Sequence, residues 1–150
     1  MARLVLTTRI EAPIERCFDL ALDVGLHQQS TAHTREFVVA GRTSGLCELE
    51  DLITWEARHL GVRQRLTVQI TELRRPYFFR DIMRKGAFRS MEHEHLFESK
   101  GGFTLMTDVF AYTVPLGWPG QLFDRLFLAG YLRRFLQQRN YFLKQVAESR

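Results

Sequence analysis

The C-terminal part of the chain carries an apolar pattern that needs a broad surface to cover it. Across 119–148, large apolar side chains recur at helical spacing, from Leu122 and Phe123 to Leu143 and Val146. A helix of this length extends about 45 Å. A helix with so wide an apolar face is not stable in water by itself, because that face has to be packed against something. The rest of the fold must therefore supply one large complementary surface.

The chain before this helix has mainly the pattern of β-strands. Residues 3–12 alternate with period two, which is typical of a strand. From residue 35 onward, six further strand-like segments each end at turn residues: 35–41, 47–59, 62–73, 77–84, 87–98 and 103–114. The short turns favour antiparallel pairing of successive strands. This meander is the only broad surface available, so we expect the sheet to curl around the helix.

Two short helices are expected between the first and second strands. Pro13 stands at a favourable first helical position, and apolar residues then repeat at helical spacing through residue 23. A second helical piece is expected around 26–32. The 150 residues suit one domain, and no linker or internal repeat divides them. The prediction is a single α+β domain, 1–150, in which a curved seven-stranded antiparallel sheet surrounds a long C-terminal helix and leaves an internal pocket.

Composition narrows the class of protein. Hydrophobic residues make up 45% and charged residues 25%, as in ordinary globular proteins. The N-terminus alternates instead of forming an apolar run, so we expect a cytoplasmic protein in which Cys17 and Cys47 are reduced and buried as small hydrophobes. The net charge is +4, but the basic residues are scattered, which argues against nucleic-acid binding. A solvated face of the last helix explains the nearest approach to a basic patch: Arg133, Arg134, Arg139 and Lys144.

Strand parity gathers polar and large apolar side chains on shared faces, because alternate residues of a strand point the same way. If these faces point inward, four polar side chains converge on a partly apolar interior: Asp81, His93, His95 and Asp108. Unpaired polar groups there are costly, so they must pair with one another, with water or with a ligand. Two interpretations stay open. The four residues brace the sheet, or they hold the polar end of a mostly apolar ligand.

The same parity predicts a pocket wall of aromatic and methionine side chains together with the polar groups. Trp55 is expected on the concave face, with Thr54 and Glu56 on the wetter face. Phe135 is expected to help close the side formed by the helix. The full set of predicted ligand-binding residues is Trp55, Phe79, Met83, Met91, His93, His95, Met106, Asp108, Phe110, Tyr112, Phe123 and Phe127.

The residue types bear on three further chemistries. His93 and His95 with either aspartate have the ligand types of a three-residue metal site, but no third histidine is placed nearby, so no metal and no other cofactor is expected. A histidine beside an aspartate also suits proton transfer next to a carbonyl, with His93, His95, Asp81 and Asp108 as the candidate catalytic residues. The apolar stretch from Leu116 to Leu128 suits contact with a membrane, although burial inside the grip of the sheet explains it with fewer assumptions.

Several segments resemble one known family. They are IEAPIERCFD at 10–19, TWEARHLG at 54–61, PYFFRD at 76–81, GAF at 86–88, HEHLF at 93–97, TLMTD at 104–108 and VPLG at 114–117. They resemble the bacterial SRPBCC ligand-binding proteins of the START and Bet v 1-like superfamily, over nearly the whole chain. The resemblance implies the helix-grip fold and a pocket, but not a particular reaction. The chain contains none of the iron- or Rieske-ligand spacings of the oxygenase branch.

Residues and resemblance together support one main interpretation and one alternative. The main one is binding or carriage of a hydrophobic small molecule, lipid-, isoprenoid- or polyketide-like, without catalysis. The alternative is a cyclase- or dehydratase-type enzyme that uses a His–Asp pair in the same cavity. No stable membrane insertion is expected, and the oligomeric state is left open.

Overall fold

A seven-stranded antiparallel sheet forms most of the described chain, in the order β1-β7-β6-β5-β4-β3-β2. The computed structural model describes residues 1–149, apart from the side chain of His33. The strands are β1 (Ala2–Ile10), β2 (Phe37–Gly41), β3 (Leu52–His59), β4 (Val62–Arg74), β5 (Phe78–Lys85), β6 (Ser90–Ser99) and β7 (Thr104–Thr113). The prediction of a seven-stranded antiparallel sheet is confirmed.

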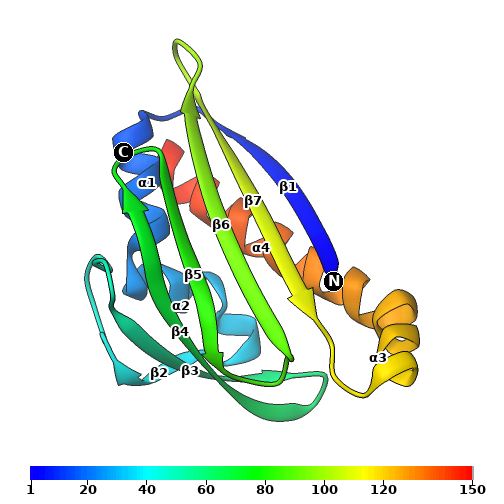
Figure 1. Cartoon of the computed structure of the whole chain (residues 1–150). Helices are drawn as coiled ribbons and strands as arrows, with labels where there is room; N and C mark the ends of the chain where they lie inside the picture. The colour runs from blue at the N-terminus through cyan, green and yellow to red at the C-terminus, as the bar shows by residue number, and fades with distance from the viewer. Residues whose placement is uncertain (150) are drawn as a thin grey trace.

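The helices connect the two edges of the sheet and cover its concave side. After β1 come α1 (Ile14–Leu22), α2 (Val24–Ser30) and the short 3-10 helix η1 (Ala32–Thr34), which lead to β2 at the opposite edge. After β7 come α3 (Gly117–Phe123), the π-helical segment η2 (Asp124–Leu128) and α4 (Ala129–Glu148). Figure 1 shows α4 crossing behind the curved sheet, with α1 beside its C-terminal end, and α4 contacts both α1 and α2. This is the predicted helix-grip arrangement.

Bulges and one tight glycine curve the sheet. The strand register shifts between Val38 and Ala40 and twice along β4, and such bulges bend a strand and increase its twist. Gly41 has φ +83°, and a Cβ there would lie 1.9 Å from the carbonyl oxygen of Leu52. Only glycine fits this position, which lets β2 approach β3 closely. The curvature keeps the sheet from packing flat on α4.

The core lies between the sheet and the helices α1, α2 and α4. Along β7 the buried positions alternate, as the parity argument predicted: Thr104, Met106, Asp108, Phe110 and Tyr112. Phe18 of α1 packs edge-on against two rings of the sheet, with centroids 5.6 Å from Phe79 and 5.3 Å from Phe97. Cys17 and Cys47 are buried free thiols, and burial raises the pKa of Cys47 to about 12. Both cysteines therefore behave as small hydrophobes, as expected.

The long C-terminal helix departs from the prediction at its start. It begins at Gly117 instead of 119, and five residues in it are π-helical. No residue of α3 or η2 is buried, so the expectation that the stretch from Leu116 to Leu128 is buried inside the grip is wrong. The physical reason is length. The sheet ends with Thr113, and the first turns of the helix project past its edge (Figure 1).

None of the helices within residues 1–149 combines the length and the apolar character needed to cross a bilayer.

Candidate functional site

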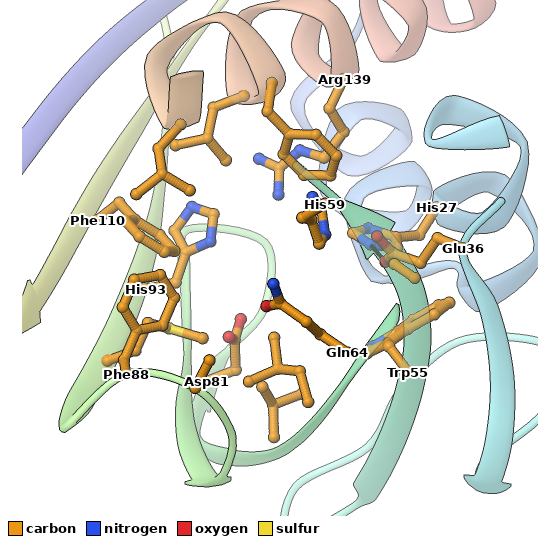
Figure 2. A pocket seen from close by; sticks show the side chains of 18 of the residues that line it. His27, Glu36, Trp55, His59, Gln64, Asp81, Phe88, His93, Phe110 and Arg139 are labelled. Atoms are coloured by element: carbon orange, nitrogen blue, oxygen red, sulfur yellow. Dashed lines mark hydrogen bonds and ion pairs between the residues drawn. The ribbon is translucent and has the colours of Figure 1, made fainter. Parts of the chain in front are cut away.

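A cavity of about 500 Å³ lies between the concave face of the sheet and the C-terminal helix. Its wall is mostly apolar and includes Trp55 of β3, Phe79 of β5, Met91 of β6, Phe110 of β7 and Phe123 of α3. Figure 2 shows these surroundings from close by, with polar groups reaching in from several sides. The cavity is of the size and composition that suit an apolar small molecule.

Many of the predicted site residues reach this cavity. Trp55, Phe79, Asp81, Met91, His93, His95, Phe110, Phe123 and Phe135 line it. Trp55 is buried, and its ring lies 4.5 Å from that of His27. Glu56 points to the other face but is buried too, because Arg65 covers it with an ion pair of 3.0 Å. The expectation of a wet position was therefore wrong for Glu56.

Five predicted ligand-binding residues are not part of the cavity wall that the described residues form: Met83, Met106, Asp108, Tyr112 and Phe127. Met106 and Tyr112 are fully buried in the core, and the Tyr112 hydroxyl donates a hydrogen bond to Asp124. Phe127 is exposed on η2. Strand parity and helical spacing assign a side chain to a face, but neither tells how deep that side chain lies beneath its neighbours.

Asp108 lies just behind the cavity wall and organises the polar groups. It is fully buried and accepts three hydrogen bonds: from Arg139 Nη2 at 2.7 Å, from Asn140 Nδ2 at 2.7 Å and from His93 Nε2 at 2.8 Å. Burial alone would raise the pKa of this carboxyl. The charge of Arg139 and the histidine hydrogen bonds instead hold the pKa well below its usual range. Asp108 is thus a buried carboxylate.

His95 links Asp108 to Asp81. Its Nε2 is 3.1 Å from Asp81 Oδ2, and its Nδ1 is 3.4 Å from Asp108 Oδ1, which is an ion-pair distance without a well-formed hydrogen bond. Burial opposes a charge on this imidazole, but the two carboxylates outweigh it and raise the pKa of His95. Burial would likewise raise the pKa of Asp81, but its bond to His95 outweighs burial and lowers that pKa. The two carboxylates therefore favour the protonated form of His95.

His93 has the opposite character. Its ring stacks on that of His95 with centroids 3.8 Å apart. Burial, followed by the neighbouring charge of His95, lowers the pKa of His93 to about 4. Because the Asp108 carboxylate only accepts, Nε2 of His93 carries the proton and Nδ1 is left as an acceptor. Figure 2 shows the His93 ring at the cavity beside Phe110.

These contacts support both interpretations of the four polar residues, as braces of the sheet and as polar groups at the cavity. The residues pair across strands on the diagonal: His93 bonds Asp108 and His95 bonds Asp81, whereas the sheet register places His95 opposite Asp108 and His93 opposite Asp81. Three of them, Asp81, His93 and His95, also line the cavity. The same groups thus brace the sheet and present polar atoms to whatever fills the space.

Asp81, His93 and His95 also have the residue types of a metal site, with one ligand atom from each within 4.8 Å of the others. A cation between them would have to replace the hydrogen bond between His95 and Asp81. It would also stand beside the guanidinium of Arg139, which is already bound to Asp108. The network is therefore better suited to hydrogen bonding than to holding a cation.

Sequence reasoning missed the contribution of the helix to this network. Arg139 and Asn140 are buried, and Arg139 lines the cavity, whereas it was expected on a solvated face. Their spacing from Leu136 and Leu143 indicates that they share the buried face of the helix, because residues i, i+3, i+4 and i+7 lie on one helical face.

Two more polar pairs at the cavity were missed. His27 contacts Glu36 at 2.7 Å, and the His59 ring contacts the Tyr131 hydroxyl at 2.7 Å. Each pair joins residues from different parts of the fold, so no local sequence pattern predicts the contact.

Comparisons with known proteins agree with this architecture. A protein from Thermus thermophilus superposes with a TM-score of 0.76 at 18% identity, covering 96% of this chain and 95% of that one. A START superfamily protein from Mycobacterium smegmatis gives 0.73 at 16% identity, covering 97% of both chains. Major latex-like protein 151 from Panax ginseng gives 0.72 at 14% identity, also covering 97% of both.

The sequence was also compared directly with known proteins and families. Among curated proteins, none matches it. Residues 10–138, however, match the family described as polyketide cyclase / dehydrase and lipid transport. Its fold is shared with the START superfamily protein from Mycobacterium smegmatis, and the chain belongs to the polyketide cyclase / dehydrase and lipid transport family.

Proposed function

We propose that this protein binds and carries a hydrophobic small molecule of the lipid, isoprenoid or polyketide type. The observation that carries the proposal is the cavity of about 500 Å³, whose wall is mostly apolar and aromatic. Pockets for small organic molecules usually have volumes of about 300–1,000 Å³ with a few placed polar groups. The ligand lies with its apolar body along Trp55, Phe110 and Phe135.

The polar end of the ligand meets the side of the cavity formed by Asp81, His93 and Arg139. His93 offers Nδ1 as an acceptor, and Asp81 offers the carboxylate oxygen that His95 does not use. Arg139 bonds Asp108 and Asn140 through Nη2 and Nε. An otherwise apolar ligand therefore gains most from a single hydroxyl or carbonyl group on this side.

Tryptophan fluorescence tests the proposal. The chain has two tryptophans, so a Trp118→Phe variant reports only on Trp55 in the cavity wall. Titration with a fatty acid, an isoprenoid alcohol and an aromatic polyketide is expected to quench or shift its emission saturably with at least one of them. The matched variant Trp55→Phe reports on exposed Trp118 and is expected to respond much less in the absence of lipid aggregates.

Native mass spectrometry gives a second readout. A purified protein that binds such a molecule is expected to retain a lipid-like species of defined mass. If Trp55 emission is indifferent to the whole panel and no species is retained, the cavity is not a binding site and the proposal fails.

The pairing of His93 with Asp108 supports a second function, catalysis of a cyclisation or dehydration. Asp108 orients His93 through Nε2, which directs the lone pair of Nδ1 toward the cavity. A base in this position takes a proton from the carbon next to a carbonyl, and the guanidinium of Arg139 stabilises the negative charge that develops on the carbonyl oxygen. Its pKa of about 4 keeps His93 neutral at neutral pH, so that its lone pair is free, and the same low pKa makes it a weak base.

A His93→Gln variant separates the enzyme from the carrier. General base catalysis contributes about 10²- to 10⁴-fold, so turnover of an aromatic poly-β-ketone is expected to fall by about that factor. Binding of the same compound, followed by Trp55 emission, is expected to weaken far less than turnover does, because the variant alters one polar contact and leaves the apolar wall of the cavity in place. Equal turnover by both proteins would mean that His93 is not the base, whereas no turnover by the wild type above the uncatalysed rate rejects catalysis and leaves the carrier function intact.

A further inference from the structure

The rim of the cavity carries an unusual density of exposed apolar side chains. We call six residues of one continuous segment the mouth patch, with exposed fractions of 80%, 75%, 46%, 44%, 61% and 61%: Leu116, Trp118, Leu122, Phe123, Leu126 and Phe127. Scattered single exposed apolar residues are ordinary on protein surfaces. Six large ones within twelve positions of one helical segment mark a surface that has a partner.

The mouth patch is continuous with the cavity. Leu116 and Phe123 belong both to the patch and to the cavity wall, and so their side chains form part of its entrance. Leu60, in the turn between β3 and β4, is another exposed residue that lines the cavity. Figure 1 shows α3 and this turn at the same end of the molecule. A partner on the patch therefore also covers the way in.

The fold holds the patch in place beyond the sheet. The hydrogen bond from the Tyr112 hydroxyl to Asp124 ties the π-helical turn to the end of β7. Gly120 packs against the Pro115 carbonyl so closely that a Cβ would lie 1.9 Å from its oxygen. The exposed side chains thus stand on an anchored helix and not on a loose segment.

The exposed charged side chains near the patch on this helical segment are all basic. Arg125, Arg133 and Arg134 are exposed, and none of them makes an ion pair with any residue in the described range 1–149. Asp124 is the one acidic residue between 117 and 147, and it is bonded to Tyr112. An apolar helix with a tryptophan and flanking arginines is typical of segments that lie in the interface of an anionic bilayer.

We propose that the mouth patch docks onto an anionic phospholipid surface, with the cavity entrance against the bilayer. A second copy of the chain fits less well. A symmetric dimer through this patch would bring the arginines of both copies together, and each copy already carries a net charge of +4. Docking is peripheral, because none of the helices in the described residues is built to cross a bilayer.

Vesicle binding tests the proposal directly. In a Trp55→Phe variant, Trp118 is the sole tryptophan and stands in the patch. Its emission is expected to shift to shorter wavelength with vesicles made of equal parts phosphatidylcholine and phosphatidylglycerol, and the protein is expected to sediment with them. Pure phosphatidylcholine vesicles, or added salt, are expected to weaken binding, since charge attraction is screened.

Two pairs of substitutions separate the apolar contribution to vesicle binding from the electrostatic contribution. Leu126→Ser with Phe127→Ser is expected to weaken binding about tenfold or more through lost apolar contact, and neither residue lines the cavity. Arg133→Gln with Arg134→Gln is expected to cost about fivefold per arginine on the anionic vesicles only. Leu49→Ser with Leu52→Ser, which removes exposed leucines near the β2–β3 connection, serves as the matched control and is expected to bind normally.

The proposal is independent of what the cavity holds. If Trp118 emission does not move and no protein sediments with anionic vesicles, membrane docking is wrong, while the response of Trp55 to dispersed ligands is unaffected. If sedimentation velocity instead shows a dimer that the Leu126→Ser/Phe127→Ser pair dissolves, the patch is a self-association surface and the proposal is overturned.

Discussion

Asp108 and His93 have different roles at this site. Asp108 touches no cavity space, yet it fixes the proton of His93, pairs with Arg139 and receives Asn140. His93 faces the cavity and depends on Asp108 for its orientation. Buried carboxylates of this kind are stable only when their hydrogen bonds are all made, so the network tolerates little change in any member.

The two stacked histidines predict opposite pH dependences. The folded-state pKa of His93 lies near 4, below the ordinary value of 6.5, so the unfolded chain takes up this proton first as the pH falls. The stability that His93 contributes is therefore complete above about pH 6.5 and is lost toward pH 4, by an amount on the order of 3 kcal/mol at most. The raised pKa of His95 works the other way, since its stabilisation is present below pH 6.5 and is lost as the pH rises through the folded value.

Urea unfolding at a series of pH values between 4 and 7 measures this effect. The free energy of unfolding of the wild type is expected to fall more steeply toward pH 4 than that of a His93→Gln variant, which has no imidazole to protonate. Histidine NMR provides the control by showing one ring neutral well below pH 6 and one ring charged above pH 6.5. Parallel stability curves for the two proteins would contradict the assignment of His93.

At the scale of elements, the C-terminal helix changes role along its length. Between Leu136 and Ala147 it packs against the sheet, α1 and α2, and it supplies Arg139 and Asn140 to the site. Between Gly117 and Leu128 it projects past the sheet and forms the cavity rim. The π-helical turn lies at the change from one role to the other, and such turns are frequent near functional sites.

Two glycines of this helical segment make a matched pair of tests. A Cβ at Gly120 would lie 1.9 Å from the Pro115 carbonyl oxygen, whereas one at Gly130 would meet only the flexible Arg134 side chain at 3.5 Å. Gly120→Ala is expected to cost about 1–3 kcal/mol through strain. Gly130→Ala is expected to gain about 0.5–1 kcal/mol, because alanine loses less backbone entropy in a helix.

Thermal unfolding of the two variants decides this point. For a chain of this size, about 1 kcal/mol corresponds to roughly 2–4 °C, so Tm is expected to fall for Gly120→Ala and to rise for Gly130→Ala. Equal shifts in both variants would mean that the close contact at Gly120 does not restrict the start of the helix.

At the scale of the whole molecule, the cavity follows from a curved sheet that a single helix cannot fill. Ala57, on the concave face of β3, lines the cavity. Ala57→Phe places a ring in that space and is expected to reduce ligand affinity about tenfold or more, without loss of stability in the absence of ligand, because the new ring is buried in an apolar space.

The control for this prediction is Ala111→Phe, which adds the same ring to the opposite face of β7. The neighbours of Ala111, Phe110 and Tyr112, both point inward. Ligand titrations that use Trp55 emission or thermal shift are expected to match the wild type for this variant. Undiminished binding by Ala57→Phe would place the ligand elsewhere on the molecule.

The sequence by itself was enough for the order and kind of the elements. Strand alternation, helical periodicity and turn residues are local signals, and each strand was found within a few residues except the third, which begins at Leu52 and not at 47. Parity also brought Asp81, His93, His95 and Asp108 together correctly, since the two-residue period of a strand assigns each side chain to a face.

Only the tertiary structure decided which of these side chains reach open space. Met106 and Tyr112 share a face with Phe110, but core residues cover them, and Phe127 lies past the end of the sheet. Arg139 belongs to the site because α4 crosses the sheet next to Asp108, to which Arg139 donates a hydrogen bond. Periodicity specifies the direction in which a side chain points from its strand or helix. How deeply that side chain is buried, how far the helix extends past the sheet and which distant elements meet depend on the curvature of the sheet and on the relative lengths of the elements. These are set by the packing of the whole chain.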